Sequence, residues 1–200
     1  MNANVETIKQ LRSQTGAGVM ECRKALEQGD WQYTTALDFL RQQMELKAQK
    51  QAGREARQGR LELYDHNHGR IGVMVEINSE TEFAGRSEVV RRFAHEIALQ
   101  IAAAAPLYVS DEEIPAGVLD ELAQAAAEKG RLAGKPEQVV AQIVAGALED
   151  YKNTHVLLRQ PYLRDESVRV AQLLSQASGQ VGEKIAVRRF VRWEVGPEEE

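Results

Sequence analysis

Two carboxylates and an aromatic side chain stand together where the sequence changes from a strand pattern to a helix pattern. Glu80 and Glu82 flank Thr81, and Phe83 follows directly. Paired acids could carry out general acid–base chemistry, but carboxylates in this position more often stabilise the positive end of a helix dipole. Ser79 with Glu82 three residues later also fits a capping box, in which each side chain accepts a hydrogen bond from the other residue's backbone N–H. We therefore expect a helix to start here, with Phe83 in its first turn.

Phe83 has two interpretations that periodicity does not separate. It lies seven residues before Val90 and therefore on roughly the same helix face as Val90, Phe93 and Ile97, a stripe typical of a buried core. The residue before the expected N-cap is Asn78, so the apolar partner that a hydrophobic staple needs is missing. The pattern leaves a buried and an exposed Phe83 equally open.

Other candidates for metal, phosphate or covalent chemistry are weak. Asp65, His66 and His68 share one turn, but two imidazoles alternating along a turn do not complete a zinc site. Residues 134–136 (GKP) resemble the end of a phosphate loop, except that proline occupies the position of the required Ser or Thr. Cys22 has no base and orienting group beside it in the sequence. We expect no bound metal and no cofactor, and these patterns do not favour catalysis.

The charge pattern disfavours a nucleic-acid surface on most of the chain. The net charge is −5, which divides into +3 for residues 1–60 and −8 for residues 61–200. Affinity for phosphate backbones comes mainly from clustered Lys and Arg. Arg188, Arg189 and Arg192 could contact RNA, but an edge strand commonly carries charges that prevent pairing with other chains. We expect a protein partner, no direct nucleic acid and no membrane; an RNA- or ribosome-associated protein is the alternative.

Composition indicates a cytoplasmic protein. Hydrophobic residues make up 43% of the sequence, which is enough for a core. No apolar run approaches the roughly 20 residues that span a membrane, and the N-terminus does not read as a signal peptide. The single cysteine excludes an internal disulfide and fits a reducing compartment.

The spacing of apolar residues predicts a small helical module followed by a mixed domain. Residues 1–46 carry three short helical patterns, at about 4–13, 19–27 and from about 31 onward. Residues 47–59 are polar on all sides, which predicts a solvated linker that is helical in part. The core domain is expected at 60–196, and residues 197–200 form an acidic tail.

Within the core domain, alternation predicts an antiparallel hairpin of residues 61–64 and 70–77, which a last strand over residues 185–195 could join. Helical periodicity is expected from residue 79 or 87 to 104, and then at about 115–130, 139–158 and 165–177. The predicted fold class is α+β, with a three-helix N-terminal module and a core whose small antiparallel sheet is covered by helices.

Four motifs resemble the bacterial elongation factor Ts family. They are residues 11–26 (LRSQTGAGVMECRKAL), 76–84 (EINSETEFA), 157–162 (LLRQPY) and 190–196 (FVRWEVG). The resemblance runs in order from Val5 to Gly196. The chain is similar to the short form of the family, which lacks the inserted coiled-coil segment of longer members.

That resemblance implies a guanine nucleotide exchange factor, without covalent chemistry of its own, for the GTPase elongation factor Tu. The N-terminal helices would form a ubiquitin-associated-like module that docks on the partner, with Leu11, Arg12 and Met20 at matching positions. The family's Thr-Asp-Phe-Val turn matches the segment Thr81, Glu82, Phe83 and Ala84. Its phenylalanine would insert into the partner and disturb the magnesium and phosphate site.

This sequence departs from the family pattern at three positions of that turn. Glu82 replaces the usual aspartate, Ala84 the usual valine and Gly85 the usual alanine. A C-terminal cysteine is also missing, so the disulfide that links some short members into dimers is not possible. A homodimer within a heterotetramer with elongation factor Tu stays open.

Overall fold

The computed structural model describes residues 3–196 of the chain, so the predicted acidic tail lies outside the described residues. The α-helices are α1 (Ala3–Thr15), α2 (Val19–Gln28), α3 (Tyr33–Gln51), α4 (Glu82–Arg86), α5 (Glu88–Ala104), α6 (Ala116–Leu132), α7 (Glu137–His155) and α8 (Val170–Val181). The strands are β1 (Gln58–His66), β2 (Ile71–Ser79), β3 (Pro161–Tyr162), β4 (Asp165–Arg169) and β5 (Ile185–Glu194), and η1 (Asp111–Glu113) and η2 (Leu157–Arg159) are short 3₁₀ turns. No helix in residues 3–196 has the length and apolar character needed to cross a membrane.

The main sheet is antiparallel with the strand order β1-β2-β5, as the sequence predicts. Its register shifts between Glu76 and Ile77, which pair with Arg189 and Val187, so one extra residue of β5 is accommodated there. A bulge of this kind reverses which residues face the core. It explains why the even apolar spacing of the last strand is interrupted at Arg189.

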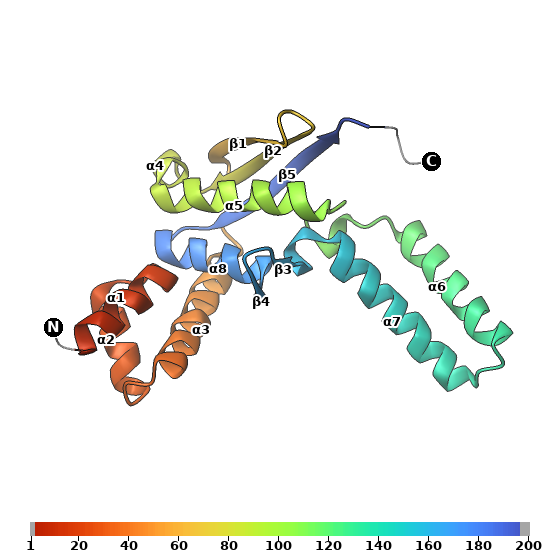
Figure 1. Cartoon of the computed structure of the whole chain (residues 1–200), viewed down its shortest axis with the longest axis horizontal. Helices are drawn as coiled ribbons and strands as arrows, with labels where there is room; N and C mark the ends of the chain where they lie inside the picture. The colour runs from red at the N-terminus through yellow and green to blue at the C-terminus, as the bar shows by residue number, and fades with distance from the viewer. Residues whose placement is uncertain (1–2, 197–200) are drawn as a thin grey trace.

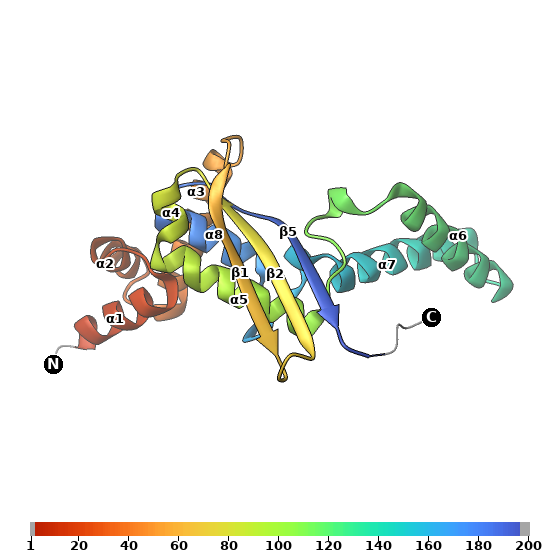
Figure 2. The ribbon, with the colours of Figure 1, turned by 90° about the horizontal axis from the view of Figure 1, so that it is seen from above.

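Helices cover one face of this sheet and leave the other open. Figures 1 and 2 show α5 lying across the strands, with α8 beside it on the same side. The buried core between them contains Val73, Val75, Ile77, Val90, Phe93, Ile97, Ile101, Leu157, Val170, Ile185 and Val187, with smaller side chains filling the gaps. The α+β class with a helix-covered antiparallel sheet is confirmed.

The N-terminal helices have a separate core and pack on the main domain through α3. That helix runs to Gln51, whose side chain is buried and lies 2.8 Å from the Ser178 hydroxyl of α8. At Gly179 the two helices approach so closely that a Cβ would lie 3.0 Å from Met44 Cβ. The linker expected from residue 47 is helical in its first part, as predicted, and Lys47, Gln49 and Lys50 are exposed, whereas Gln51 is buried against α8. The division into domains stays a prediction.

The structure decides between the two expected starts of the helix that ends at residue 104, and it corrects one further helix prediction. The helix α5 starts at its N-cap Ser87, which has extended backbone angles (φ −62°, ψ 151°) and accepts a hydrogen bond from Val90 N; a start at Ser79 is wrong, because α4 is a separate helix. The helix expected from Asp165 begins only at Val170, since residues 161–169 form the β3–β4 hairpin. Asp165 instead accepts hydrogen bonds from the backbone and hydroxyl of Ser167.

The helices α6 and α7 form an antiparallel pair that projects away from the sheet (Figure 1). These are the two helices that the apolar spacing predicts at about 115–130 and 139–158. Arg159 of η2 anchors the base of this pair by donating two hydrogen bonds to Asp111, at 2.6 and 2.5 Å, and one to Glu149 of α7, at 2.8 Å.

Close backbone packing beneath α4 gives a stability prediction. A Cβ on Gly85 would lie 2.9 Å from Gly59 Cα, a backbone atom that cannot rotate away. We expect Gly85→Ala to lower the free energy of unfolding in urea by ~1–3 kcal/mol, the usual cost of overpacking.

Gly146 of α7 is the matched control, because a Cβ there would meet nothing within 4 Å. Gly146→Ala is expected to raise stability by ~0.5–1 kcal/mol through helix propensity. A Gly85→Ala protein as stable as the unmodified chain would contradict the packing argument.

Candidate partner-binding surface

The helix α4 has one side on the sheet and presents Phe83 outward. Ala84 is fully buried and Gly85 is buried against Gly59, whereas Phe83 is 86% exposed. The break at Ser87 removes Phe83 from the apolar stripe of α5. Periodicity left open whether Phe83 is buried or exposed, and the structure shows that it is exposed and not part of the protein's own core.

Thr81, not Ser79, is the N-cap of α4. Its Oγ1 accepts a hydrogen bond from Ala84 N at 3.2 Å, while Ser79 is the last residue of β2 and donates its hydroxyl proton to Thr81 O. The predicted capping box is therefore wrong. Glu82 lies in the first turn of α4 and forms an ion pair with Arg86, one turn later. Its negative charge also interacts favourably with the positive end of the helix dipole.

Two acids hold the turn that precedes α4. Glu183, in the loop between α8 and β5, accepts from Thr81 N at 3.0 Å and from Thr81 Oγ1 at 2.8 Å. Glu80 accepts from Lys184 N at 2.6 Å and from Arg54 Nη1 at 3.1 Å. Sequence reasoning missed Glu183, because nothing local connects it with a residue that is 102 positions away.

The environment of Glu80 suits a structural anion. The hydrogen bond from the Lys184 backbone, followed by that from Arg54, lowers the pKa of Glu80 below its ordinary value of 4.5. An acid or base for neutral-pH catalysis needs a pKa near the working pH. Glu80 is therefore ionised near neutral pH and serves to hold the turn.

The predicted residues of the N-terminal module divide between surface and core. Met20 is 72% exposed and Arg12 is also exposed, whereas Leu11 is fully buried in the core of the module. A direct partner contact by Leu11 does not fit this position, and the same holds for the buried side chain of Ala84. In both Figure 1 and Figure 2, α1, α2 and α4 lie at the same end of the molecule.

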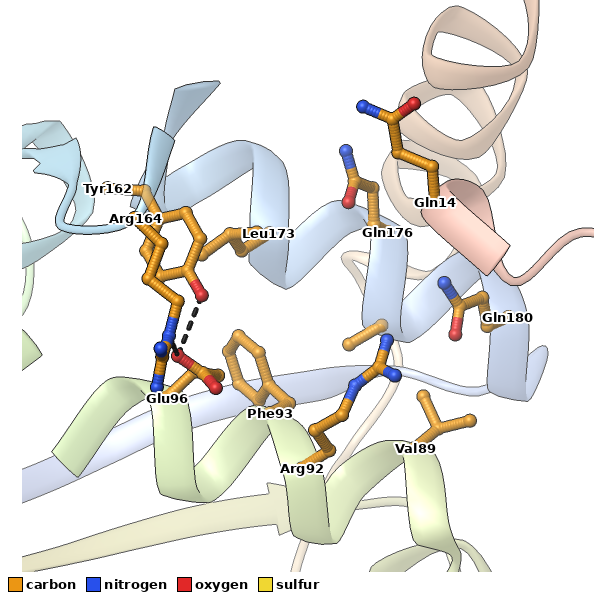
Figure 3. Close-up of a pocket in the computed structure, with 11 residues that line it drawn as sticks. Gln14, Val89, Arg92, Phe93, Glu96, Tyr162, Arg164, Leu173, Gln176 and Gln180 are labelled. Carbon is orange, nitrogen blue, oxygen red and sulfur yellow. Dashed lines mark hydrogen bonds and ion pairs between the residues drawn. The ribbon is translucent and has the colours of Figure 1, made fainter. Parts of the chain in front are cut away.

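A hollow of about 540 Å³ lies between α1, α5, α8 and the β3–β4 hairpin, and Figure 3 shows its lining. Glu96 accepts hydrogen bonds from Tyr162 Oη and Arg164 Nε, both at 2.7 Å. Burial and the bond to Glu96 raise the pKa of Tyr162 to about 12. Burial alone would raise the pKa of Glu96, but Arg164 and Tyr162 lower it. Neither group is poised for proton transfer near neutral pH.

Asp65, Arg189 and Arg192, which were considered for metal or RNA binding, contact other parts of the fold. Asp65 accepts from Gly69 N at 2.7 Å within the hairpin turn, and residues 3–196 contain no cluster of three or more possible ligands. Arg189 pairs with Glu76 at 2.7 Å across the sheet, and Arg192 donates to the Ala102 carbonyl.

Comparison with known proteins covers almost the whole chain. The family described as "Elongation factor TS" matches residues 4–197. Elongation factor Ts of Coprothermobacter proteolyticus is 41% identical over 196 residues, which cover 98% of this chain and 100% of that protein. Those of Thermoanaerobacter sp. (strain X514) and Moorella thermoacetica are each 41% identical, over 96% and 94% of this chain and 95% and 93% of theirs.

The chain belongs to the elongation factor Ts family. It is accordingly a translation elongation factor that acts in protein biosynthesis. The resemblance that the four motifs indicated is confirmed over nearly the full length.

The structure clarifies the departures from the elongation factor Ts pattern. Ala84 is fully buried, so the smaller side chain alters packing beneath α4 and removes no exposed area beside Phe83. Gly85 is suited to this chain because Gly59 occupies the space of a Cβ. Glu82 keeps the charge at the first turn of α4 and extends toward Arg86.

The lowered pKa of Glu80 predicts how stability depends on pH. Between the folded and unfolded pKa values the folded protein binds fewer protons, so its stability rises with pH in that window and is lost as pH falls through the folded pKa. We expect Glu80→Gln to be less stable than the unmodified chain at pH 7, and the gap to narrow as the pH falls below 4.5, the ordinary value for Glu80.

Urea unfolding at a series of pH values measures this effect, with Glu121→Gln on the exposed face of α6 as the control. Parallel stability curves for the Glu80→Gln protein and the unmodified chain would show that ionisation of Glu80 does not stabilise the folded turn.

Proposed function

We propose that this protein is a guanine nucleotide exchange factor for elongation factor Tu, acting in the cytoplasm. It would promote GDP release by inserting Phe83 near the magnesium and phosphate site of the partner. The observation that carries the proposal is an 86% exposed phenylalanine on a short, capped helix, within the segment that matches the family's Thr-Asp-Phe-Val turn.

Exchange of this kind needs no covalent chemistry by the factor. A factor that binds the nucleotide-free partner more tightly than the GDP-bound partner lowers GDP affinity by the same ratio, because the coupling is reciprocal. Burying a phenylalanine is worth roughly 1.5–3 kcal/mol, and each tenfold change requires about 1.4 kcal/mol. Phe83 could thus supply about 10- to 100-fold of the effect.

The remaining binding energy is assigned to the surface around Phe83 and to the N-terminal module. Thr81 and Glu82 lie beside Phe83 on the exposed side of α4, while Arg12 and Met20 are exposed on α1 and α2. Because these elements lie at one end of the molecule, one partner could contact both groups. The buried side chains of Leu11 and Ala84 would then contribute indirectly, by packing beneath the helices that carry the exposed contact residues.

Release of fluorescent GDP from elongation factor Tu tests the function. The unmodified chain should accelerate release, and unchanged release at saturating concentration would contradict the proposal.

Phe83→Ala is expected to lower the maximal release rate by about 10- to 100-fold. Its unfolding free energy should hardly change, because the side chain is exposed. Leu107→Ala, at another exposed apolar position, is the control and should retain full activity.

We further propose that two copies of the chain associate through the open face of the sheet. The apolar side chains on this face are Leu61, Leu63, Met74, Val191 and Trp193, and Leu63, Met74 and Val191 form one row across the three strands. Trp193 lies opposite Gly72, where the neighbouring strand offers no side chain, so the face is flat there. Exposed apolar patches of this kind mark interaction sites, and two such sheets can stack as a sandwich.

The mass in solution tests this association. We expect sedimentation equilibrium to give about twice the 22.3 kDa chain mass for the unmodified protein. Leu63→Lys should yield monomers, because it places a charge on the face that the dimer would bury. Leu132→Lys, at another exposed apolar position, on α6, should stay dimeric. A monomeric unmodified protein at tens of micromolar would refute the dimer.

A further inference from the structure

We propose that Glu183 is a positioning residue for Phe83, and that its loop fixes the orientation of Phe83 relative to the N-terminal helices. This inference rests on the proposed exchange function. It concerns residues 182–184 between α8 and β5, which we call the positioning loop.

The side chain of Glu183 contacts Thr81 directly. The two carboxylate oxygens of Glu183 accept from Thr81 N at 3.0 Å and from Thr81 Oγ1 at 2.8 and 3.1 Å. Because its proton points to Glu183, the Thr81 hydroxyl presents a lone pair to Ala84 N and completes the N-cap of α4. Glu183 therefore selects the side-chain orientation of Thr81 that starts the helix carrying Phe83.

The backbone of the positioning loop is held by hydrogen bonds to α8. Gly182 ends α8 in the left-handed region (φ +79°), and its N–H donates to Ser178 O at 2.8 Å. The Ser178 hydroxyl lies 2.6 Å from the backbone oxygen of Glu183 and 2.8 Å from the buried side-chain amide of Gln51. The position of Glu183 is thus tied to the last residue of α3.

Lys184 connects the positioning loop to two other segments of the chain. Its backbone N–H donates to Glu80, the residue before Thr81, at 2.6 Å. Its ammonium donates to the carbonyls of Ala52 and Arg54, at 2.6 and 2.8 Å, in the segment that leaves α3. Arg54 in turn donates to Glu80. The positioning loop therefore contacts both the turn that holds Phe83 and the chain leaving the N-terminal helices.

These bonds matter for exchange because two separate groups must meet one partner surface. A ligand group held in its bound orientation avoids the entropy cost of ordering upon binding. Hydrogen bonds to an ionised carboxylate are roughly twice as strong as neutral ones, so Glu183 is suited to holding an exposed helix of five residues in place. Loss of Glu183 should disturb Phe83 and leave Arg12 and Met20 in position.

The test separates maximal rate from affinity in the GDP release assay. We expect Glu183→Ala to lower the maximal release rate by about tenfold, equivalent to ~1.4 kcal/mol, with a smaller change in the concentration that gives half-maximal effect. Glu183→Gln should lose less, because its amide oxygen can still accept from Thr81 N. It also provides the measurement if the alanine variant does not fold. Glu166→Ala, at an exposed position of β4, is the matched control.

A double-mutant cycle with Phe83→Ala decides whether Glu183 acts through Phe83. If it does, Glu183→Ala causes little further loss in a chain that already lacks the phenylalanine. Additive losses would show general destabilisation and overturn the inference. Full activity of both Glu183 variants, with Phe83→Ala impaired, would overturn the inference alone. Full activity of Phe83→Ala would remove the proposed role of Phe83 and this inference with it.

Discussion

A helix of five residues is not stable by itself in water, because nucleation fixes several residues before hydrogen bonds repay the cost. The helix α4 is of this length, and it must nevertheless carry Phe83 away from the protein. Contacts with the rest of the protein stabilise this short helix. Ala84 is buried below, Gly85 lies against Gly59, and Thr81 caps the first turn while held by Glu183. The exposed aromatic is possible because the opposite side of the helix is firmly packed.

Carboxylates in this protein stabilise structure by meeting backbone N–H groups and arginines. Glu80 and Glu183 hold the turn before α4 in this way. Asp111 does the same at the base of the α6–α7 pair, where hydrogen bonds from Arg159 lower the pKa of its carboxyl group. Glu96 joins the β3–β4 hairpin to α5 through Tyr162 and Arg164. Acidic residues that could suggest catalysis in the sequence therefore join distant segments of the fold.

The proposed exchange activity fits a protein of this construction. Differential binding requires only that contacts be stronger with one state of the partner than with the other. A protruding phenylalanine on a firmly held helix and a second exposed surface on α1 and α2 meet that requirement without a nucleophile or a metal. In Figure 2, α1 and α2 lie to one side of the sheet, so association of two copies through its open face would leave this second surface accessible.

The sequence by itself determined what depends on local periodicity and on motifs. Alternation in β2 and the three-residue spacing of α1 predicted those elements, since burial of one face requires the same pattern in any context. The motif at 76–84 was sufficient to suggest the family and to single out Phe83. The α+β class could also be predicted, because strand and helix patterns are both present in one core.

Only the tertiary structure decided the features that rest on contacts between distant residues. Ser79 and Ser87 both fit a helix start locally, and the packing of α4 on β1 and β2 places the cap at Thr81. The family resemblance names Leu11 as a partner-docking position, whereas in the folded chain its side chain is buried in the module core. The strand β4 forms because β3 pairs with it, although the same residues fit a helix. Glu183 had no local signal, because its hydrogen bonds to Thr81 exist only once α8 and β5 bring their loop beside the turn.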